Sequence, residues 1–215
     1  MASSKAVVLI TGANQGIGYF IALQLAASGK YHVLVGARSV TAAVMAVSTQ
    51  FGHLDILINN AGRGESSAAT VRDQYREIFE VNVFGVAAVT DAFLPLIQAS
   101  SYTDRRIVNV SSGVRLITMA NEEGFEYNAQ AYYVPDYRSS KAAVNMITVA
   151  QSVNFAKHDI AVVAAAPGMC RTRFTGEYGA KDPREGAAAI VRAATEGDPK
   201  KLTGTFVADE PHTGW

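Results

Sequence analysis

The 215-residue chain is predicted to form a doubly wound α/β sheet, in which parallel strands have helices on both faces. Short β-branched runs alternate with longer Ala-rich segments, and runs such as Val-Val-Leu-Ile and Ile-Leu-Ile are apolar throughout. Continuous apolar strands are typical of parallel strands covered on both sides, and strand-helix alternation is typical of a parallel sheet. With no linker or charge block in the sequence, residues 1–215 are predicted to be a single domain.

Six strands are expected, at residues 6–10, 31–36, 54–59, 106–110, 160–165 and 205–208. Helices are expected between them, near residues 17–28, 41–51, 70–99, 137–157 and 184–196. Thr70 and Asp73 have the spacing of a capping box, so Thr70 is predicted to be the N-cap of the third helix. Pro95 is expected to bend or end that helix.

The composition excludes several classes of protein. Nineteen Lys and Arg residues balance nineteen Asp and Glu residues, which leaves no overall charge to hold a nucleic acid or an anionic membrane. The apolar run near the start is too short for a signal sequence, and no segment is expected to span a bilayer, so a cytoplasmic protein is expected. The four histidines and Cys170 show no metal-ligand spacing, so no metal site is predicted.

A glycine-rich loop directly follows the first strand and opens the first helix. Glycines permit a tight turn and close backbone approach, and a helix N-terminus offers free N–H groups to a pyrophosphate. The glycines are four and then two residues apart, unlike the usual dinucleotide fingerprint, so a simple strand-to-helix turn is the alternative. The candidate cofactor contacts in this loop are Thr11, Gly12, Asn14, Gln15, Gly16, Ile17 and Gly18.

The end of the second strand indicates which nucleotide is bound. A carboxylate there would accept hydrogen bonds from the ribose of NAD, but no carboxylate precedes Asp55. Arg38 lies twenty residues after Gly18, and Ser39 adds a second donor. A cation at this place suits the 2′-phosphate of NADP, so NADPH/NADP is predicted. The alternative is that Arg38 is a solvated loop residue.

Three further residues suggest proton chemistry on a carbonyl group. Tyr137 and Lys141 are four residues apart and therefore share one face of a predicted helix. A phenol is a poor proton donor at neutral pH unless a neighbouring ammonium favours its ionised form, and Lys141 can supply that charge. Ser112 follows a strand, at the edge where α/β sheets bind ligands, and can orient a carbonyl oxygen.

With these motifs the chain resembles the short-chain dehydrogenase/reductase family from residue 7 to residue 206, and most closely its carbonyl-reductase-like members. Residues 11–18 resemble the family's TGxxxGIG loop, Asn59 with Asn60, Ala61 and Gly62 its NNAG segment, and Tyr137 with Lys141 its YxxxK pair. The resemblance implies a Rossmann fold and NADPH-dependent reduction of a ketone or aldehyde. A homodimer or homotetramer is also expected from it.

The resemblance also implies a role for each matching residue. Tyr137 would be the general acid, Lys141 would lower its pKa and bind the nicotinamide ribose, and Ser112 would polarise the substrate carbonyl. Asn82 would hold a water in the proton relay. Near the nicotinamide the family's PGxxxT segment is matched by Pro167, Gly168 and Thr172.

The sequence departs from the family's pattern in two places. Only seventeen residues separate Gly36 from Leu54, which leaves room for one helix, so the family's third strand and one flanking helix are predicted to be absent. Loss of this adenine wall implies weakened NADP binding, a wall supplied by a partner subunit, or a catalytically impaired nucleotide-binding or interaction protein. An incomplete or alternatively spliced gene product would show the same gap. Residues 114–136 form an insertion that either lines the substrate pocket or is a surface excursion.

Overall fold

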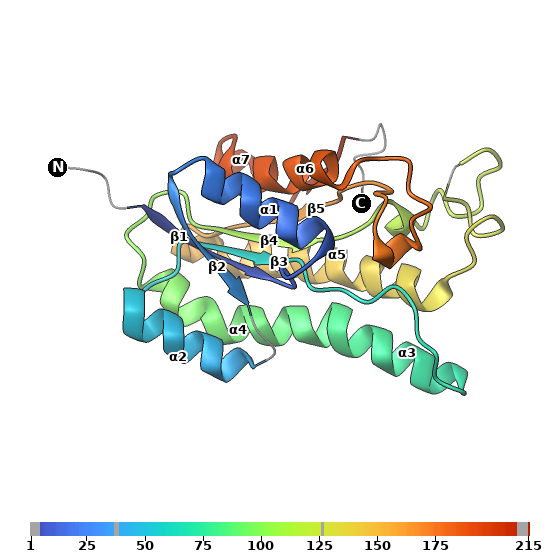
Figure 1. Cartoon of the computed structure of the whole chain (residues 1–215), viewed down its shortest axis with the longest axis horizontal. Coiled ribbons are helices and arrows are strands. Elements are labelled where there is room, and N and C mark those ends of the chain that lie inside the picture. Colours follow the sequence, from blue (N-terminus) through green and yellow to red (C-terminus); the bar gives the residue numbers. More distant parts are fainter. Residues whose placement is uncertain (1–4, 37–38, 126, 210–214) are drawn as a thin grey trace.

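The computed structural model describes residues 5–36, 39–125, 127–209 and 215. Six parallel strands form one sheet in the order β2-β1-β3-β4-β5-β6 (Figure 1). The strands are β1 (Ala6–Thr11), β2 (Tyr31–Gly36), β3 (Ile56–Asn59), β4 (Arg106–Val110), β5 (Ala161–Ala165) and β6 (Phe206–Val207). The order reverses direction between β1 and β3, so the predicted doubly wound sheet is confirmed.

Helices cover both faces of the sheet (Figure 1). One face carries α1 (Gly16–Ala27), α6 (Pro183–Thr195) and the short α7 (Pro199–Leu202), and the other carries α2 (Val40–Phe51), α4 (Gly85–Gln98) and α5 (Pro135–Phe155). Alternate side chains of β1 point to the two faces, Val8 and Ile10 toward Ile21 and Ile190, and Val7 and Leu9 into a second cluster. That second cluster includes Val47, Phe93, Ile97 and Phe155. Because both faces are buried, the strands can be apolar throughout.

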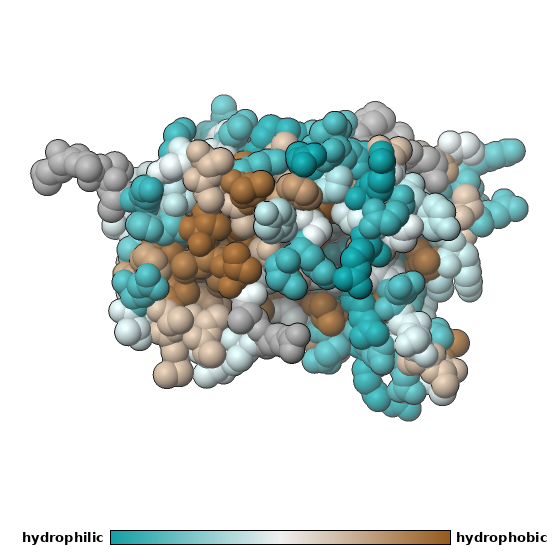
Figure 2. Space-filling model, in the orientation of Figure 1, coloured by the Kyte–Doolittle hydropathy of each residue, from teal (hydrophilic) through white to brown (hydrophobic). Residues whose placement is uncertain are grey.

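The predicted loss of one strand and one helix is confirmed. After β2 the chain forms α2 and then enters β3, which pairs with the opposite edge of β1. This leaves β2 at the edge of the sheet, where Val35 is 52% exposed. Figure 2 shows hydrophobic surface gathered on the side of the molecule where Figure 1 places β1 and β2. The deletion has therefore uncovered apolar surface without breaking the sheet.

The long helix predicted at residues 70–99 consists of three parts. Thr70 accepts a hydrogen bond from the N–H of Asp73 and caps α3 (Val71–Phe79), as predicted. A five-residue π-turn, η1 (Glu80–Phe84), joins α3 to α4. Pro95 does not end the helix, which continues to Gln98, because Phe93 and Ile97 on the same stretch are buried in the core. Burial of these side chains outweighs the hydrogen bond lost at proline.

The expectation that no segment is long and apolar enough to span a bilayer is wrong by length and composition. The helical stretch Val71–Gln98 is long and apolar enough to cross a bilayer. Of its most apolar 18-residue segment, 33% is buried inside the structure. Its apolar character has a local cause, since Ile78, Phe93 and Ile97 pack into the fold. No other described helix passes the same criteria.

A buried polar network fixes the helices that carry the site. Asn59 on β3 donates to Thr90 on α4 at 3.0 Å and to Asn109 on β4 at 2.9 Å. Asn109 in turn donates to Thr148 on α5 at 3.0 Å. Buried polar groups are costly unless paired, so this chain of bonds sets the position of α4 and α5 relative to the sheet.

Candidate active site

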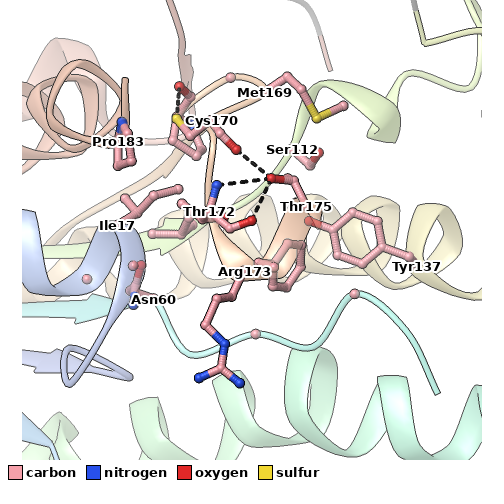
Figure 3. Close-up of a pocket in the computed structure, with 18 of the residues that line it drawn as sticks. Ile17, Asn60, Ser112, Tyr137, Met169, Cys170, Thr172, Arg173, Thr175 and Pro183 are labelled. Carbon is pink, nitrogen blue, oxygen red and sulfur yellow. Dashed lines mark hydrogen bonds between the residues drawn. The ribbon is translucent and has the colours of Figure 1, made fainter. Parts of the chain in front are cut away.

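A cavity of about 840 Å³ opens at the carboxyl ends of the strands. Its walls come from the loops after β1, β3, β4 and β5 and from the first turns of α5. Figure 3 shows Ile17 and Asn60 at one end, Ser112 and Tyr137 at the other, and the segment from Met169 to Thr175 between them. Ligands of doubly wound sheets bind at this edge, where the strand order reverses.

The glycine loop is shaped by two residues with positive φ. Gly12 has φ +64°, and a Cβ added to it would lie 2.8 Å from the Cα of Ala61. Gly16 has φ +57°, and a Cβ added there would meet nothing within 4 Å. Only glycine permits the first approach, whereas the second position faces open space at the start of α1. The loop thus brings bare backbone to the cavity.

Thr11 and Asn60 hold this loop in place. The Thr11 hydroxyl accepts hydrogen bonds from the N–H groups of Asn60 and Ala61, both at 3.0 Å. The Asn60 amide donates to the carbonyls of Thr11 and Gly12 at 2.9 and 3.2 Å. Asn60 lines the cavity, whereas Thr11 lies behind its lining and holds the loop after β3 through its hydroxyl.

The start of α1 is suited to a pyrophosphate. Gln15 is the N-cap and makes no side-chain cap hydrogen bond, and no acidic residue lies in the first turn. The first N–H groups of the helix therefore point to the cavity without a side-chain acceptor, and the helix dipole favours an anion there. The cavity is lined at this end by Gly12, Asn14, Gln15, Gly16, Ile17 and Gly18, all predicted cofactor contacts.

The adenine side of the predicted cofactor site is less well defined. Arg38 lies outside the described residues. Ser39 is the N-cap of α2, accepts the N–H of Ala42 at 3.2 Å and does not line the cavity. Ala61 and Gly62, two of the candidate cofactor contacts, line the cavity after β3. Of the described candidates on this side, Ser39 therefore lies outside the cavity wall and Ala61 and Gly62 belong to it.

Tyr137, Ser112 and Lys141 meet at the other end of the cavity. All three line it, and the Ser112 side chain lies close enough to the Tyr137 hydroxyl to lower the pKa of the phenol. Lys141 is 5% exposed, its Nζ lies 5.7 Å from the centroid of the Tyr137 ring, and it donates to the carbonyl oxygen of Val110 at 2.9 Å. The neighbouring Ser111 instead donates to Asn145 at 2.7 Å and is buried. Of the two serines, Ser112 is the one placed beside the phenol.

Burial sets the pKa values of this pair. Burial raises the pKa of Tyr137 to about 12, and the Ser112 side chain offsets part of that rise. Burial lowers the pKa of Lys141 to about 8. The expected lowering of the Tyr137 pKa by Lys141 is thus wrong for this structure, because desolvation of the phenolate dominates. Tyr137 is protonated at neutral pH and can donate its proton.

Asn82 lies behind the site and does not line the cavity. It is fully buried in the π-turn, accepts the N–H of Arg63 at 2.7 Å, and donates to the carbonyl of Arg63 at 2.9 Å and to the hydroxyl of Ser140 at 3.0 Å. A Cβ added to Gly62 would lie 3.5 Å from the Asn82 side-chain oxygen and 3.8 Å from Lys141 Nζ. Asn82 therefore fixes the loop after β3 against α5, next to the amine.

The segment after β5 forms the roof of the cavity. Pro167, Gly168 and Thr172, the candidate contacts of the nicotinamide end, all line it. Thr172 precedes the short helix η4 (Arg173–Thr175): its N–H donates to the Thr175 hydroxyl at 3.2 Å, and its carbonyl oxygen accepts from that hydroxyl at 3.0 Å (Figure 3). These two bonds hold the roof segment in one conformation.

The insertion at residues 114–136 folds onto the site. Val114, Leu116, Phe125 and Tyr127 form a small buried cluster, against which Tyr137 and Met169 pack. Val114, Tyr127, Tyr132 and Val134 line the cavity. The insertion is therefore a wall of the cavity, and the alternative of a surface excursion away from the site is not supported.

Several residues of the cavity carry no sequence motif. They include Phe20, Gly64, Glu65, Met169, Arg171, Arg173, Phe174, Glu177 and Tyr178. Phe174 and Tyr178 could have been proposed as cavity residues from the sequence, because they are aromatic residues shortly after the PGxxxT match. Gly64 is recognised as a cavity residue only in the structure, where the Phe174 ring packs on it.

Comparison with known proteins identifies the family of this chain. The sequence profile of the short-chain dehydrogenase family matches residues 34–183. The short-chain dehydrogenase anuI of Penicillium roqueforti is 49% identical, with 97% of this chain and 96% of the relative covered. That alignment runs over 242 positions, more than the 215 residues of the chain, so the relative has residues without a counterpart here. The short-chain dehydrogenase/reductase eupG of a Phoma species is 30% identical over 86% of the chain and 84% of the relative.

Solved structures show the same architecture. An NADPH-bound carbonyl reductase from chicken fatty liver superposes with a TM-score of 0.78 at 25% identity, covering 95% of this chain and 96% of the other. The salutaridine reductase of Papaver somniferum superposes with a TM-score of 0.77 at 22% identity, over 96% of this chain and all of the other. By fold and site the protein is an α/β oxidoreductase of the dinucleotide-binding class. More narrowly, it belongs to the short-chain dehydrogenase family.

Proposed function

We propose that the protein reduces a ketone or aldehyde to an alcohol with NADPH. The observation that carries the proposal is the pairing of Ser112 and Tyr137 at one end of the cavity whose other end is the glycine loop. A bound nicotinamide cofactor supplies a hydride to the carbonyl carbon. The chain itself then has to bind the carbonyl, supply one proton to its oxygen and keep water away.

The two hydroxyls divide that work. Ser112 donates a hydrogen bond to the carbonyl oxygen and orients it. Tyr137 is held protonated by burial and transfers its proton to the same oxygen as negative charge develops there. Lys141, charged below its pKa of about 8, stabilises the phenolate left on Tyr137. Asn82 acts as a positioning residue through its bonds to the loop after β3 and to Ser140.

NADPH is proposed over NADH because of the charges at the end of the second strand. No carboxylate precedes Asp55, and Arg38 and Ser39 follow β2. A guanidinium can bind the 2′-phosphate with two hydrogen bonds, and NADH lacks that group. We expect NADPH to bind at least about tenfold more tightly than NADH, and Arg38→Gln to remove most of the difference.

The test of the proposed activity is oxidation of NADPH in the presence of a panel of aryl and alkyl ketones and aldehydes. The wild-type protein is expected to consume NADPH with at least one of them. Tyr137→Phe should bind NADPH with unchanged affinity in a fluorescence titration and lose turnover by about a hundredfold or more, the usual contribution of a positioned acid. Equal turnover by both proteins would refute the role of Tyr137.

A second function has one observation in its favour. Because β2 is an edge strand and the adenine wall is absent, the chain can be a member of the family that retains the fold without useful turnover. A folded wild-type protein that binds neither NADPH nor NADH would support this alternative.

We also propose that the protein assembles as a homodimer or homotetramer. Phe84, Met146 and Val153 are 55%, 69% and 75% exposed on η1 and α5, more than large apolar side chains usually are. The uncovered edge at β2 is a second apolar surface. Light scattering coupled to size-exclusion chromatography tests the assembly, and a monomer at high protein concentration would contradict it.

A further inference from the structure

Phe174 lies directly against the catalytic tyrosine. The centroids of the Phe174 and Tyr137 rings are 5.6 Å apart, and the ring planes meet at 61° in an edge-to-face arrangement. This geometry is one of the preferred arrangements for aromatic pairs. Phe174 is 47% exposed and lines the cavity, so it presents one side to Tyr137 and another to the open space.

A second wall of the cavity is shaped around the same ring. A Cβ added to Gly64 would lie 2.8 and 2.9 Å from two ring atoms of Phe174, closer than carbon atoms approach without strain. Gly64 belongs to the loop after β3, whereas Phe174 belongs to the segment after β5. The missing side chain at Gly64 is therefore what lets Phe174 reach across the cavity mouth.

The backbone that carries Phe174 is fixed. The Thr175 hydroxyl accepts the N–H of Thr172 at 3.2 Å and donates to the carbonyl oxygens of Cys170 and Thr172 at 2.7 and 3.0 Å (Figure 3). Gly176 ends the turn with φ +57°. Phe174 thus stands on a braced turn, so its ring position is a property of the fold.

The space beyond Ser112 and Tyr137 has an aromatic and apolar lining. A substrate whose carbonyl oxygen meets both hydroxyls must place its carbon substituents there. Phe174 faces this space together with side chains from the insertion and from the roof, namely Val114, Tyr127, Tyr132, Val134 and Met169. Four charged side chains, Glu65, Arg171, Arg173 and Glu177, also line the cavity, so its walls are charged as well as apolar. Aromatic rings and a thioether favour an aromatic guest over a saturated one of the same size.

We infer that Phe174 determines substrate specificity, and that the cavity beside Tyr137 takes a ketone with an aryl ring next to the carbonyl. The inference rests on the proposed reductase activity and adds the class of substrate. The aryl ring would lie against Phe174, whose position depends on Gly64 and on contact with Tyr137. An edge-to-face or stacked pair favours the aryl substrate by about two- to tenfold over its saturated analogue.

The experiment compares acetophenone with cyclohexyl methyl ketone, which has the same carbon skeleton and a saturated ring. Because the two ketones differ in intrinsic reactivity, the readout is the change in the ratio of their kcat/KM values between variants. Phe174→Leu removes the ring and keeps the apolar character. Gly64→Ala leaves Phe174 intact but pushes its ring aside, since the added Cβ would lie 2.8 Å from it. Tyr133→Leu is the control, because Tyr133 is 80% exposed and does not line the cavity.

The aryl preference is expected to fall by about two- to tenfold in Phe174→Leu and in Gly64→Ala, and to be unchanged in Tyr133→Leu. The same ratio in all four proteins would overturn the inference while leaving the reductase activity intact. Absence of turnover with either ketone, and with the wider panel, would count against the reductase activity instead. The cavity would then be tested by dissociation constants of the two ketones from ligand-observed NMR: a preference for acetophenone that is lost in Phe174→Leu supports the inference, and equal binding overturns it.

Discussion

Replacing Lys141 with methionine should make the protein more stable while removing its activity. The Lys141 amine is 5% exposed, its pKa is lowered by burial from 10.5 to about 8, and its one described hydrogen bond is to the carbonyl of Val110. Methionine has a similar length and carries no charge. Lys141→Met therefore removes a buried ammonium whose charge destabilises the folded state and which the proposed reaction requires.

The magnitude follows from the pKa. Each pKa unit corresponds to about 1.4 kcal/mol, so near pH 7 the charge costs the folded state about 3 kcal/mol relative to the unfolded chain. Loss of the hydrogen bond to Val110 offsets about 1 to 2 kcal/mol of the gain. The net stabilisation is about 1 to 2 kcal/mol, or roughly 2 to 8 °C in Tm for a chain of this size.

The pH dependence gives the prediction its sign. Between pH 8 and 10.5 the Lys141 amine binds its proton more tightly in the unfolded state than in the folded state. The penalty that this charge imposes on folding therefore shrinks as the pH rises, and the free energy of unfolding of the wild type increases. Near pH 10 the penalty has shrunk to below about 1 kcal/mol, and the advantage of Lys141→Met should vanish. Urea denaturation at both pH values measures this, with Lys157→Met as the control at an exposed lysine. A variant that is less stable than wild type near pH 7, or equally stabilised at both pH values, would refute the reasoning.

Three further predictions concern the same site. The kcat/KM for carbonyl reduction should fall above about pH 8 as Lys141 loses its proton, and a pH profile of Lys141→Arg should move this fall to higher pH. In thermal denaturation, Gly12→Ala should lower the free energy of unfolding by about 2 to 3 kcal/mol, because the added Cβ would lie 2.8 Å from the Cα of Ala61. Gly16→Ala, measured in the same way, should lower it by only about 1 kcal/mol, the cost of a side chain at positive φ. Asn82→Ala should cost about 1 to 3 kcal/mol in urea denaturation, since it leaves the part-buried N–H and carbonyl of Arg63 without their side-chain partner.

Much of the fold was predictable because parallel strands buried on both faces have a distinctive apolar pattern. The missing strand followed from length alone, since seventeen residues between Gly36 and Leu54 hold one helix and no more. The π-turn at Glu80–Phe84 and the passage of the helix through Pro95 were not predictable, because both depend on packing against distant residues. Local propensity does not report such tertiary contacts.

The site was predictable where backbone geometry demands a residue type, as at Gly12, and where Tyr137 and Lys141 share a helix face. What the sequence could not supply is the balance between burial and charge, which raises the pKa of Tyr137 where a neighbouring ammonium suggested the opposite. It also could not show that the Thr11 hydroxyl is used within the loop, or that Phe174 reaches Gly64. Each of these depends on contacts between residues far apart in the chain.

Calorimetric titration with NADPH of the wild type and two Gly16 variants tests the central claim most directly, namely that the glycine loop holds a dinucleotide although the adenine wall is absent. Gly16 has positive φ, which Asn and Asp both tolerate, and its Cβ direction is open. Gly16→Asn and Gly16→Asp therefore differ mainly in one negative charge beside the expected pyrophosphate. We predict one NADPH bound per chain in the wild type, and binding at least about tenfold weaker in Gly16→Asp than in Gly16→Asn. Equal affinities of the two variants, or no binding by folded wild-type protein, would contradict the account.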